Sequence, residues 1–251
     1  WRAVRAGLAG GSRGRGGGLC REFLARLAGL RVLDPACGTG NFLYVALDLL
    51  RGLEREVLAV LAELGEGPGA ARVGPQQLWG IERNPWSQQI AELVLWIAAL
   101  QAGVPPGSGT IAAGDALLVA EPGGGWRASV WPEVDYIVSN PPFHEGVRTS
   151  YDAADRLIRE APKHLCPGGR LMLVANAFLP YRDALDQTFG AHAVLAESVK
   201  HLQRHFGRID PPLGDVLRIR RGAVDLPDDG GGDTLRAATD WDADPDGRLS
   251  V

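Results

Sequence analysis

Two segments of the chain, about a hundred residues apart, carry residue types that can bind a ligand and do chemistry on it. The first segment reads DPACGTGNF, from Asp34 to Phe42. Its glycines, Gly38 and Gly40, allow the backbone to turn sharply and to approach a ligand closely. Because an apolar strand is expected at Leu30–Leu33 and a helix follows, the segment predicts a strand-to-helix turn that binds a ligand.

The second segment, NPPF, offers two hydrogen-bond acceptors and an aromatic ring. Asn140 supplies a side-chain carbonyl oxygen and Pro141 a backbone carbonyl oxygen, and both can accept hydrogen bonds from an amino group. Pro142 stiffens the turn, and Phe143 offers a face on which a base can stack. The segment could therefore grip a base, although Asn-Pro-Pro can also form a plain turn.

Parallel strands would bring these segments together. Further apolar strands are predicted at residues 77–81, 110–113 and 134–138, and NPPF follows the last of them. Glu82 ends the first of these strands, and Asp115 and Ala116 follow the second. In an open α/β sheet the carboxyl ends of the strands form the crevice where ligands bind, so these side chains are expected at one edge.

A short helix is predicted at residues 22–28, before the first strand. Further helices are predicted after the strands, at residues 42–64, after Asn84-Pro85 and at residues 152–165. The helix after Asn84-Pro85 is expected to pack on the sheet through an apolar stripe: Ile90, Leu93, Val94, Ile97 and Leu100. A turn at 166–169, strands at 170–175 and 191–197 and an edge strand at 216–220 complete the pattern. Strands that alternate with helices predict an α/β fold with a doubly wound, mostly parallel sheet.

Three regions follow from composition. Residues 1–19 are predicted as a flexible basic arm, because residues 1–31 hold seven arginines against the lone Glu22 and are rich in glycine. This arm could lie over a phosphate backbone, although the whole chain has a net charge of -4 and no overall footprint for nucleic acid. Residues 20–198 form the main domain, and residues 199–251 read as an irregular or partly disordered tail.

Cysteine usage and hydropathy exclude some classes of protein. Cys20, Cys37 and Cys166 are too few and too widely spaced for a disulfide framework or a metal site, so we expect no metal and a reducing cytoplasm. No apolar stretch is long enough for a membrane span, and no signal peptide is recognised. The chain begins at Trp1 and its only methionine is Met172, so further sequence is expected upstream.

Residues 20–143 resemble the catalytic domain of adenine-N6 DNA methyltransferases of the fused restriction-modification type. The resemblance rests on RVLDPACGTGNFLYVALDLLRGLEREV, LWGIERNPWSQQIAELVLWIA, GDALL and WPEVDYIVSNPPF. It implies a class I, Rossmann-like methyltransferase fold with S-adenosylmethionine as the cofactor. It implies cofactor contacts from Asp34, Ala36, Gly38, Gly40, Asn41, Phe42, Glu82, Asp115 and Ala116.

The resemblance also implies individual roles for some of these residues. Asp34 would orient the amino group of the cofactor, beside the backbone amides of residues 38–41. Glu82 would accept the ribose hydroxyls, and Asp115, with Ala116, would lie beside the adenine edge. Glu82 can also be a plain exposed acid at a strand end, and Asp115 can be a turn-forming aspartate. Cys37 is interpreted as a small packing residue rather than a nucleophile, because methyl transfer needs no covalent adduct.

From Asn140 to Glu197 the chain is closely similar to the 16S ribosomal RNA guanine-N2 methyltransferases. Residues 208–250 resemble a fragment of penicillin-acylase-type amidases, from which no catalytic residue is carried over. The expected reaction is methyl transfer to a base of a nucleic acid, with Asn140, Pro141, Pro142 and Phe143 as catalytic residues. Adenine-N6 of DNA is favoured, rRNA guanine-N2 is the alternative, and an inactive chimeric module is the third. The oligomeric state is not predicted.

Overall fold

A computed structural model describes residues 1, 4–5, 13–67, 69, 71–101, 103, 110–121, 123–141, 144–145, 148–149, 152–175, 181–197 and 215–220. The chain forms two compact units. The first comprises Trp1–Ser139 with Lys163–Cys166, and the second comprises Asn140–Pro162 with Pro167–Val251.

The sheet of the first unit has the strand order β6-β1-β2-β3. Its strands are β1 (Val32–Asp34), β2 (Leu78–Glu82), β3 (Ile111–Ala113) and β6 (Val134–Ser139). Each neighbouring pair is parallel, and Leu33 lies opposite both Trp79 of β2 and Ile137 of β6. The chain therefore runs outward from β1 to β3 and then returns to the other side of β1. This reversal of strand order marks the place where open α/β sheets bind ligands, at the carboxyl ends of β1 and its neighbours.

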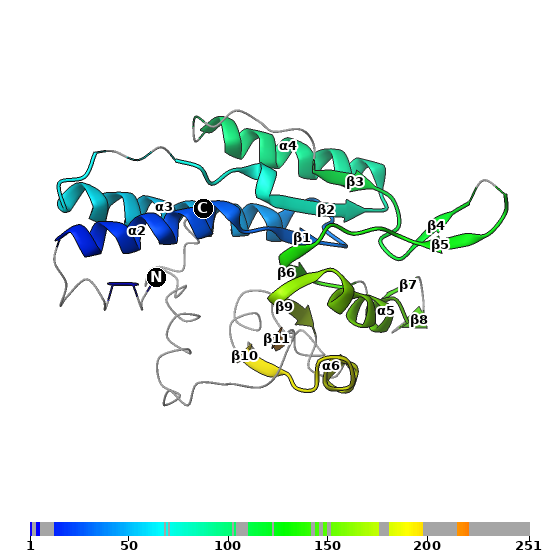
Figure 1. Cartoon of the computed structure of the whole chain (residues 1–251). Coiled ribbons are helices and arrows are strands. Elements are labelled where there is room, and N and C mark those ends of the chain that lie inside the picture. Colours follow the sequence, from blue (N-terminus) through cyan, green and yellow to red (C-terminus); the bar gives the residue numbers. More distant parts are fainter. Residues whose placement is uncertain are drawn as a thin grey trace, which may run out of the picture. The chain divides into compact units, whose positions relative to one another are not determined.

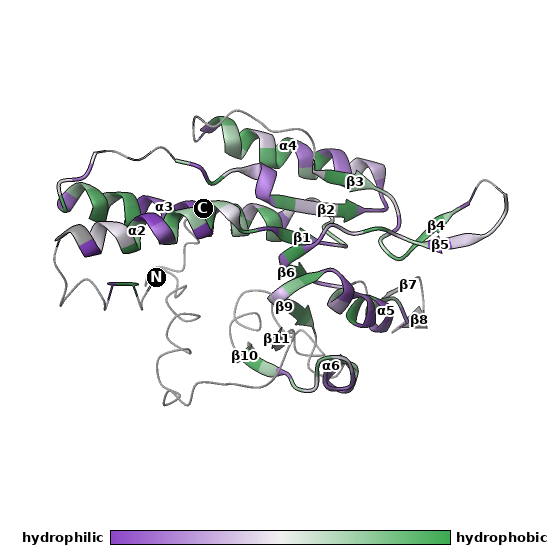
Figure 2. Ribbon diagram, in the orientation of Figure 1, coloured by the Kyte–Doolittle hydropathy of each residue, from purple (hydrophilic) through white to green (hydrophobic). Residues whose placement is uncertain are grey.

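Helices α3 (Asn41–Glu63) and α4 (Pro85–Gln101) cover one face of this sheet together (Figure 1). In Figure 2, green segments of β2 and β3 mark their hydrophobic residues. The shared core joins strand residues to residues of both helices: Val32, Leu78 and Ile111 from the strands, Leu43 and Leu47 from α3, and Ala91, Leu95 and Ala98 from α4. This core fixes the start of α3, and hence the turn that precedes it.

The apolar stripe predicted for α4 is wrong. Ile90, Leu93, Ile97 and Leu100 are 44–65% exposed and Val94 is half-buried, whereas Ala91, Leu95, Ala98 and Ala99 are buried. Both faces of this helix are apolar, so periodicity alone could not choose between them. Helix α4 packs on the sheet through the face that carries alanines, because small side chains let the helix approach the sheet closely.

Helix α2 spans Arg13–Gly29 and begins nine residues before the predicted start. It runs alongside α3 in Figure 1 and buries Cys20 against Val57 and Leu61. Arg21 also forms an ion pair with Glu66. Residues 13–19, predicted as part of the flexible arm, are therefore helical, because tertiary packing overrides the poor helix propensity of three consecutive glycines. Residues 2–3 and 6–12 of that arm lie outside the described residues.

A two-stranded antiparallel hairpin lies between β3 and β6 in the sequence. It consists of β4 (Leu118–Ala120) and β5 (Trp126–Ala128). After it, Trp131 is buried and its indole Nε1 donates a hydrogen bond of 2.6 Å to the carbonyl oxygen of Ala116. Trp131 thereby ties the hairpin to the segment that follows β3.

The second unit contains helices α5 (Asp152–Glu160) and α6 (Tyr181–Phe189) and the antiparallel strands β10 (Ala193–Glu197), β11 (Asp215–Arg220) and β9 (Leu165–Ala175), in that order. The short strands β7 (His144–Glu145) and β8 (Arg148–Thr149) pair with each other. Two predictions fail here. β11 pairs on both sides and is not an edge strand, and residues 166–169 lie in β9 instead of forming a turn. The other tail residues, and most of the acylase-like stretch, lie outside the described residues.

Candidate active site

The turn between β1 and α3 is built by backbone hydrogen bonds. The amide of Gly40 donates to the carbonyl of Cys37 at 2.8 Å, and the amide of Cys37 donates to the carbonyl of Ile81 at 3.2 Å. The first bond closes the turn and the second ties it to β2. Gly40 then caps α3, where Asn41 is exposed and Phe42 is half-buried. The predicted strand-to-helix turn is therefore present at this position.

Both glycines of the turn have positive φ angles, 55° at Gly38 and 84° at Gly40. A Cβ atom at Gly40 would also lie 3.0 Å from the Cβ of Ala91 and 3.2 Å from its Cα. A Cβ atom at Gly38 would meet nothing within 4 Å. Gly40 is thus required twice, by backbone conformation and by the close approach of α4.

Glu82 holds the turn from the neighbouring strand end. One carboxylate oxygen accepts the amide of Gly38 at 2.9 Å, and the other accepts the amide of Asn84 at 2.7 Å. The Gly38 amide, expected to face the cofactor, is thereby directed to Glu82. The half-buried carboxylate retains lone pairs on both oxygens, so it can still accept hydroxyl groups.

Asp34 is fully buried and supports the turn from inside. Its Oδ1 accepts hydrogen bonds from the amide of Ala36 at 3.0 Å and from the hydroxyl of Ser139 at 3.1 Å. Its Oδ2 has no hydrogen-bond partner among the described residues. Burial raises the pKa of this carboxyl to about 7, and the nearby carboxylate of Glu82 adds to the rise. The direct contact predicted between Asp34 and the amino group of the cofactor stays a prediction.

Ser139 is the residue that the sequence reasoning missed. It is 1% exposed, ends β6 and directly precedes Asn140. A hydroxyl side chain on the buried face of a strand, next to a functional turn, requires a partner. The sequence shows this hydroxyl residue, but it does not show that Asp34 is its hydrogen-bond partner.

Asp115 has the turn-forming role that its sequence position also allowed. Its Oδ1 accepts the amides of Leu117 and Leu118 at 2.8 and 3.1 Å, while the preceding Gly114 donates its amide to the carbonyl of Glu82 at 2.9 Å. These bonds place Asp115 and Ala116 at the same sheet edge as Glu82. Asp115 also lines a cavity of about 140 Å³ whose walls include Leu33, Trp79 and Ile81. Contact of Asp115 with an adenine ring stays a prediction.

Cys37 packs inside the turn as predicted. It is 5% exposed, and a Cβ atom at Gly80 would lie 2.8 Å from its sulfur. Burial raises the pKa of its thiol to about 12, and the carboxylates of Asp34 and Glu82 contribute in the same direction. A thiol of this kind is inert as a nucleophile at neutral pH.

The NPPF segment is described in part. Asn140 is exposed and Pro141 is buried, while Pro142 and Phe143 lie outside the described residues. Among the described residues, no group of three or more potential metal ligands is present, and no helix has the length and hydropathy to span a membrane.

The sheet edge of the first unit fits S-adenosylmethionine. The cofactor carries positive charge and ribose hydroxyls, and this edge offers the carboxylate of Glu82 and the unsatisfied, buried Oδ2 of Asp34. The glycine turn leaves space for close approach by a ligand, because a Cβ atom at Gly38 would contact nothing.

Comparison with known proteins agrees with this geometry. Residues 13–161 match the family described as the MmeI DNA-methyltransferase domain, and residues 127–202 match the methyltransferase small domain. The solved structure of the restriction-modification enzyme MmeI in complex with DNA is similar in fold, with a TM-score of 0.52 and 19% identity over 84% of this chain and 33% of that chain.

The curated relatives that match the chain are ribosomal RNA methyltransferases. The ribosomal RNA small subunit methyltransferase C of Photorhabdus laumondii is 59% identical over 73 residues, which cover 29% of this chain and 22% of the relative. Its counterpart from Pasteurella multocida is 38% identical over 177 residues, 70% of this chain and 51% of the relative. The chain thus spans about half of one relative and less of the other. The two predicted resemblances to methyltransferases, of DNA adenine and of 16S ribosomal RNA, are confirmed, and the acylase-like resemblance stays a prediction.

The predicted class I, Rossmann-like fold is also confirmed. Because the MmeI family model covers more than half of the chain, the chain belongs to the MmeI DNA-methyltransferase domain family of S-adenosylmethionine-dependent methyltransferases.

Proposed function

We propose that the chain transfers a methyl group from S-adenosylmethionine to the exocyclic amino nitrogen of a nucleic-acid base. One observation carries the proposal. The buried hydrogen bond between Ser139 and Asp34 joins the cofactor turn to the residue that precedes Asn140. Ser139 is followed in the chain directly by Asn140, which supports a role for the two motifs in one transfer reaction between two bound molecules.

The chain's own residues orient the acceptor nitrogen. The side-chain carbonyl of Asn140 and the backbone carbonyl of Pro141 accept the two amino hydrogens, which directs the nitrogen lone pair at the methyl carbon. Held by Asp34, Glu82 and the glycine turn, S-adenosylmethionine would supply an activated methyl sulfonium, whose sulfur would become a neutral thioether. As the N–C bond forms and the S–C bond breaks, the amine loses one proton to solvent. Phe143 stacks on the base, which leaves the helix to reach the site.

We favour guanine-N2 of small-subunit rRNA as the substrate, which revises the preference for DNA adenine from the sequence. The support is the 59% identity to a ribosomal RNA small subunit methyltransferase over 73 residues. The second candidate, adenine-N6 of DNA, is supported by the match of residues 13–161 to the MmeI DNA-methyltransferase domain. Both reactions present an exocyclic amino group, but the two bases differ in the donors and acceptors beside it.

Calorimetric titration with S-adenosylhomocysteine tests the cofactor. We expect binding by the parent chain and weaker binding by Glu82→Ala, because the substitution removes the acceptor for the ribose and the support of Gly38. Asn140→Ala is the matched variant, and its affinity should equal that of the parent. A folded chain that binds no ligand at millimolar concentration would refute the proposal.

Methyl transfer is then measured with tritiated S-adenosylmethionine on small ribosomal subunits and on unmethylated duplex DNA, followed by digestion to nucleosides. We expect label in N2-methylguanosine and loss of transfer in Asn140→Ala. Label only in N6-methyladenine would reverse the choice of substrate. Cofactor binding without transfer to either nucleic acid would identify an inactive module.

A further inference from the structure

Asp34 is a buried acid without a positive charge beside it. The acids buried among the described residues are Asp34, 0% exposed, and Glu54, 4% exposed. Glu54 lies near Arg51 and favours the charged form of that guanidinium. No described arginine or lysine pairs with Asp34, and its Oδ2 accepts no hydrogen bond from the described residues. A negative charge on Asp34 is therefore not offset in the way that the charge of Glu54 is.

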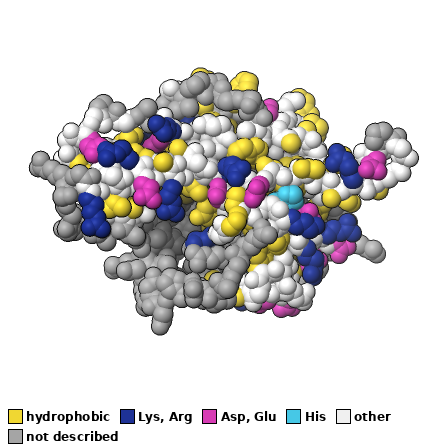
Figure 3. Space-filling view, in the orientation of Figure 1, with side chains coloured by type: hydrophobic (Ala, Val, Ile, Leu, Met, Phe, Trp, Pro, Cys, Tyr) yellow, Lys and Arg dark blue, Asp and Glu magenta, His cyan; other side chains and the backbone are white. Residues whose placement is uncertain are grey.

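The charge of Asp34 also acts over a longer range than that of a surface acid. The carboxylates coloured magenta in Figure 3 lie at the surface, where water and salt screen them. In a protein interior with an effective dielectric constant of about 20, two unit charges about 10 Å apart interact strongly enough to change an affinity about tenfold. A cationic ligand at the sheet edge can thus favour the ionised form of Asp34 without touching it.

Asp34 and Glu82 support the same glycine turn. Oδ1 of Asp34 accepts the amide of Ala36 at 3.0 Å, and Glu82 accepts the amide of Gly38 at 2.9 Å. The carboxylate of Glu82 lies close enough to act on Asp34 electrostatically. A ligand that binds at this turn therefore brings its charge within the electrostatic range of Asp34.

Few titratable groups surround Asp34 in the described part of the chain. They are Glu82 at the end of β2 and the thiol of Cys37 in the turn, while β6 contributes the hydroxyl of Ser139 and the first turn of α3 carries no charged residue. Burial raises the pKa of Asp34 to about 7, and the carboxylate of Glu82 adds to this rise. Burial raises the pKa of the Cys37 thiol to about 12, so that thiol stays neutral. Asp34 is thus the group placed to change its charge near neutral pH when a cation binds.

We propose that Asp34 discriminates between the cofactor and its product through its own charge. Ionised Asp34 favours S-adenosylmethionine, whose sulfur is a cationic sulfonium, over S-adenosylhomocysteine, whose sulfur is a neutral thioether. Protonated Asp34 has no charge and favours neither ligand. Binding of the cationic ligand therefore releases the proton of Asp34 to solvent, and the preference for the cofactor increases as the pH rises through about 7. The inference rests on the proposed methyl transfer, of which S-adenosylhomocysteine is the product.

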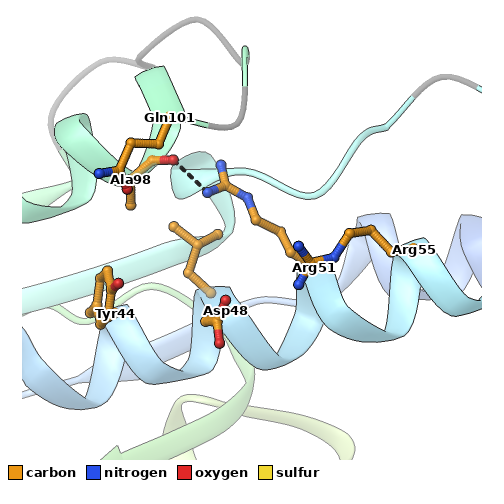
Figure 4. Close-up of a pocket in the computed structure, with 7 residues that line it drawn as sticks. Tyr44, Asp48, Arg51, Arg55, Ala98 and Gln101 are labelled. Carbon is orange, nitrogen blue, oxygen red and sulfur yellow. Dashed lines mark hydrogen bonds between the residues drawn. The ribbon is translucent and has the colours of Figure 1, made fainter. Parts of the chain in front are cut away.

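Calorimetric titration of both ligands between about pH 5 and pH 8 tests the proposal. For the parent chain we expect the affinity for S-adenosylmethionine, divided by that for S-adenosylhomocysteine, to rise about tenfold over this range. Asp34→Asn removes the charge and keeps an oxygen acceptor, so its ratio should rise much less. Titration of the ligands themselves affects both proteins alike. Asp48→Asn is the matched control, because Asp48 is exposed on α3 in the pocket of Figure 4, and its ratio should follow that of the parent.

Two further measurements do not depend on Asp34→Asn. Titration of the parent at pH 7 in two buffers with different heats of ionisation counts the protons released, and S-adenosylmethionine should release more than S-adenosylhomocysteine. Ser139→Ala should move the rise in the affinity ratio to higher pH, because the Ser139 hydrogen bond opposes the effect of burial on Asp34. Ser139→Thr keeps the hydroxyl and should not move it. Circular dichroism and thermal unfolding establish that each variant is folded.

The outcomes separate this inference from the proposed function. A parent ratio that does not change with pH, an equal rise in Asp34→Asn, or equal proton release by the two ligands would overturn the role of Asp34, even with methyl transfer intact. If the folded parent binds neither ligand, the proposed function fails and this inference fails with it.

Discussion

The hydroxyl of Ser139 donates a hydrogen bond of 3.1 Å to Oδ1 of Asp34, although the two residues are 105 positions apart. The bond connects the carboxyl ends of β6 and β1 below the protein surface. Since Asn140 follows Ser139 directly, this contact relates the start of the NPPF segment to the turn that begins at Asp34.

Removal of the Ser139 hydroxyl should change both the stability of the chain and the pKa of Asp34. Ser139→Ala is expected to lower the free energy of unfolding by about 1–2 kcal/mol, because Asp34 loses a donor inside the protein. It should also raise the pKa of Asp34 further, since the Ser139 hydrogen bond opposes the effect of burial. Ser139→Thr keeps the hydroxyl and serves as the control. Denaturant unfolding of the three proteins as a function of pH gives both quantities, and an unchanged pH profile in Ser139→Ala would contradict the link.

The raised pKa of Asp34 predicts that stability falls as the pH rises. The carboxyl titrates near 7 in the folded chain against an ordinary value of 3.8, so the folded state binds the proton more tightly. The stabilisation is complete below pH 3.8 and is lost as the pH rises through about 7, at about 1.4 kcal/mol for each pKa unit of difference.

Asp34→Asn isolates this contribution from those of other acids. Asparagine keeps an oxygen acceptor for Ala36 and Ser139 and has no charge to bury. The free energy of unfolding of the variant should therefore vary less between pH 4 and pH 8 than that of the parent, and the variant should be the more stable protein at pH 8. Parallel profiles for the two proteins would show that Asp34 is ionised throughout this range.

The two glycines of the turn should differ in their tolerance of alanine. Gly38→Ala should lose stability only because alanine is strained at a positive φ, on the order of 1–2 kcal/mol. Gly40→Ala meets the same penalty and also forces its methyl group against Ala91. We expect a larger loss of stability in Gly40→Ala, with partial recovery when Ala91→Gly is added. Thermal unfolding of the four proteins decides this, and equal losses at both glycines would show that α4 moves away without penalty.

The three cysteines should react unequally with a thiol reagent. Cys20 and Cys37 are buried, and burial raises the pKa of both thiols, whereas Cys166 is half-buried. Iodoacetamide at pH 8 should therefore modify Cys166 first in the native chain and all three cysteines in denaturant. Mass spectrometry of the digested protein locates the label. Early labelling of Cys37 would mean that the turn opens in solution.

The sequence predicted the elements of the sheet better than their packing. Apolar runs and glycine turns located β1, β2, β3 and β6 within two residues, because strand and turn signals are local. The inner face of α4 was assigned wrongly, since a helix with leucine, isoleucine and tryptophan on one side and alanine on another has no unique core face. The burial of Asp34 was also beyond prediction, because its partner Ser139 is distant in the sequence.

The pairing of β1 with β6 also bears on how the chain folds. Leu33 lies opposite Ile137, so one side of β1 has no neighbour from the first unit's sheet until about a hundred further residues have been synthesised. Until then β1 exposes a row of unpaired amides and carbonyls, the kind of edge that pairs with other chains. Closing so long a loop is slow compared with forming local helices such as α3. The carboxyl edge at β1 and β6 is therefore among the last parts of the first unit to form, and a nascent chain that stalls before Ser139 is at risk of aggregation.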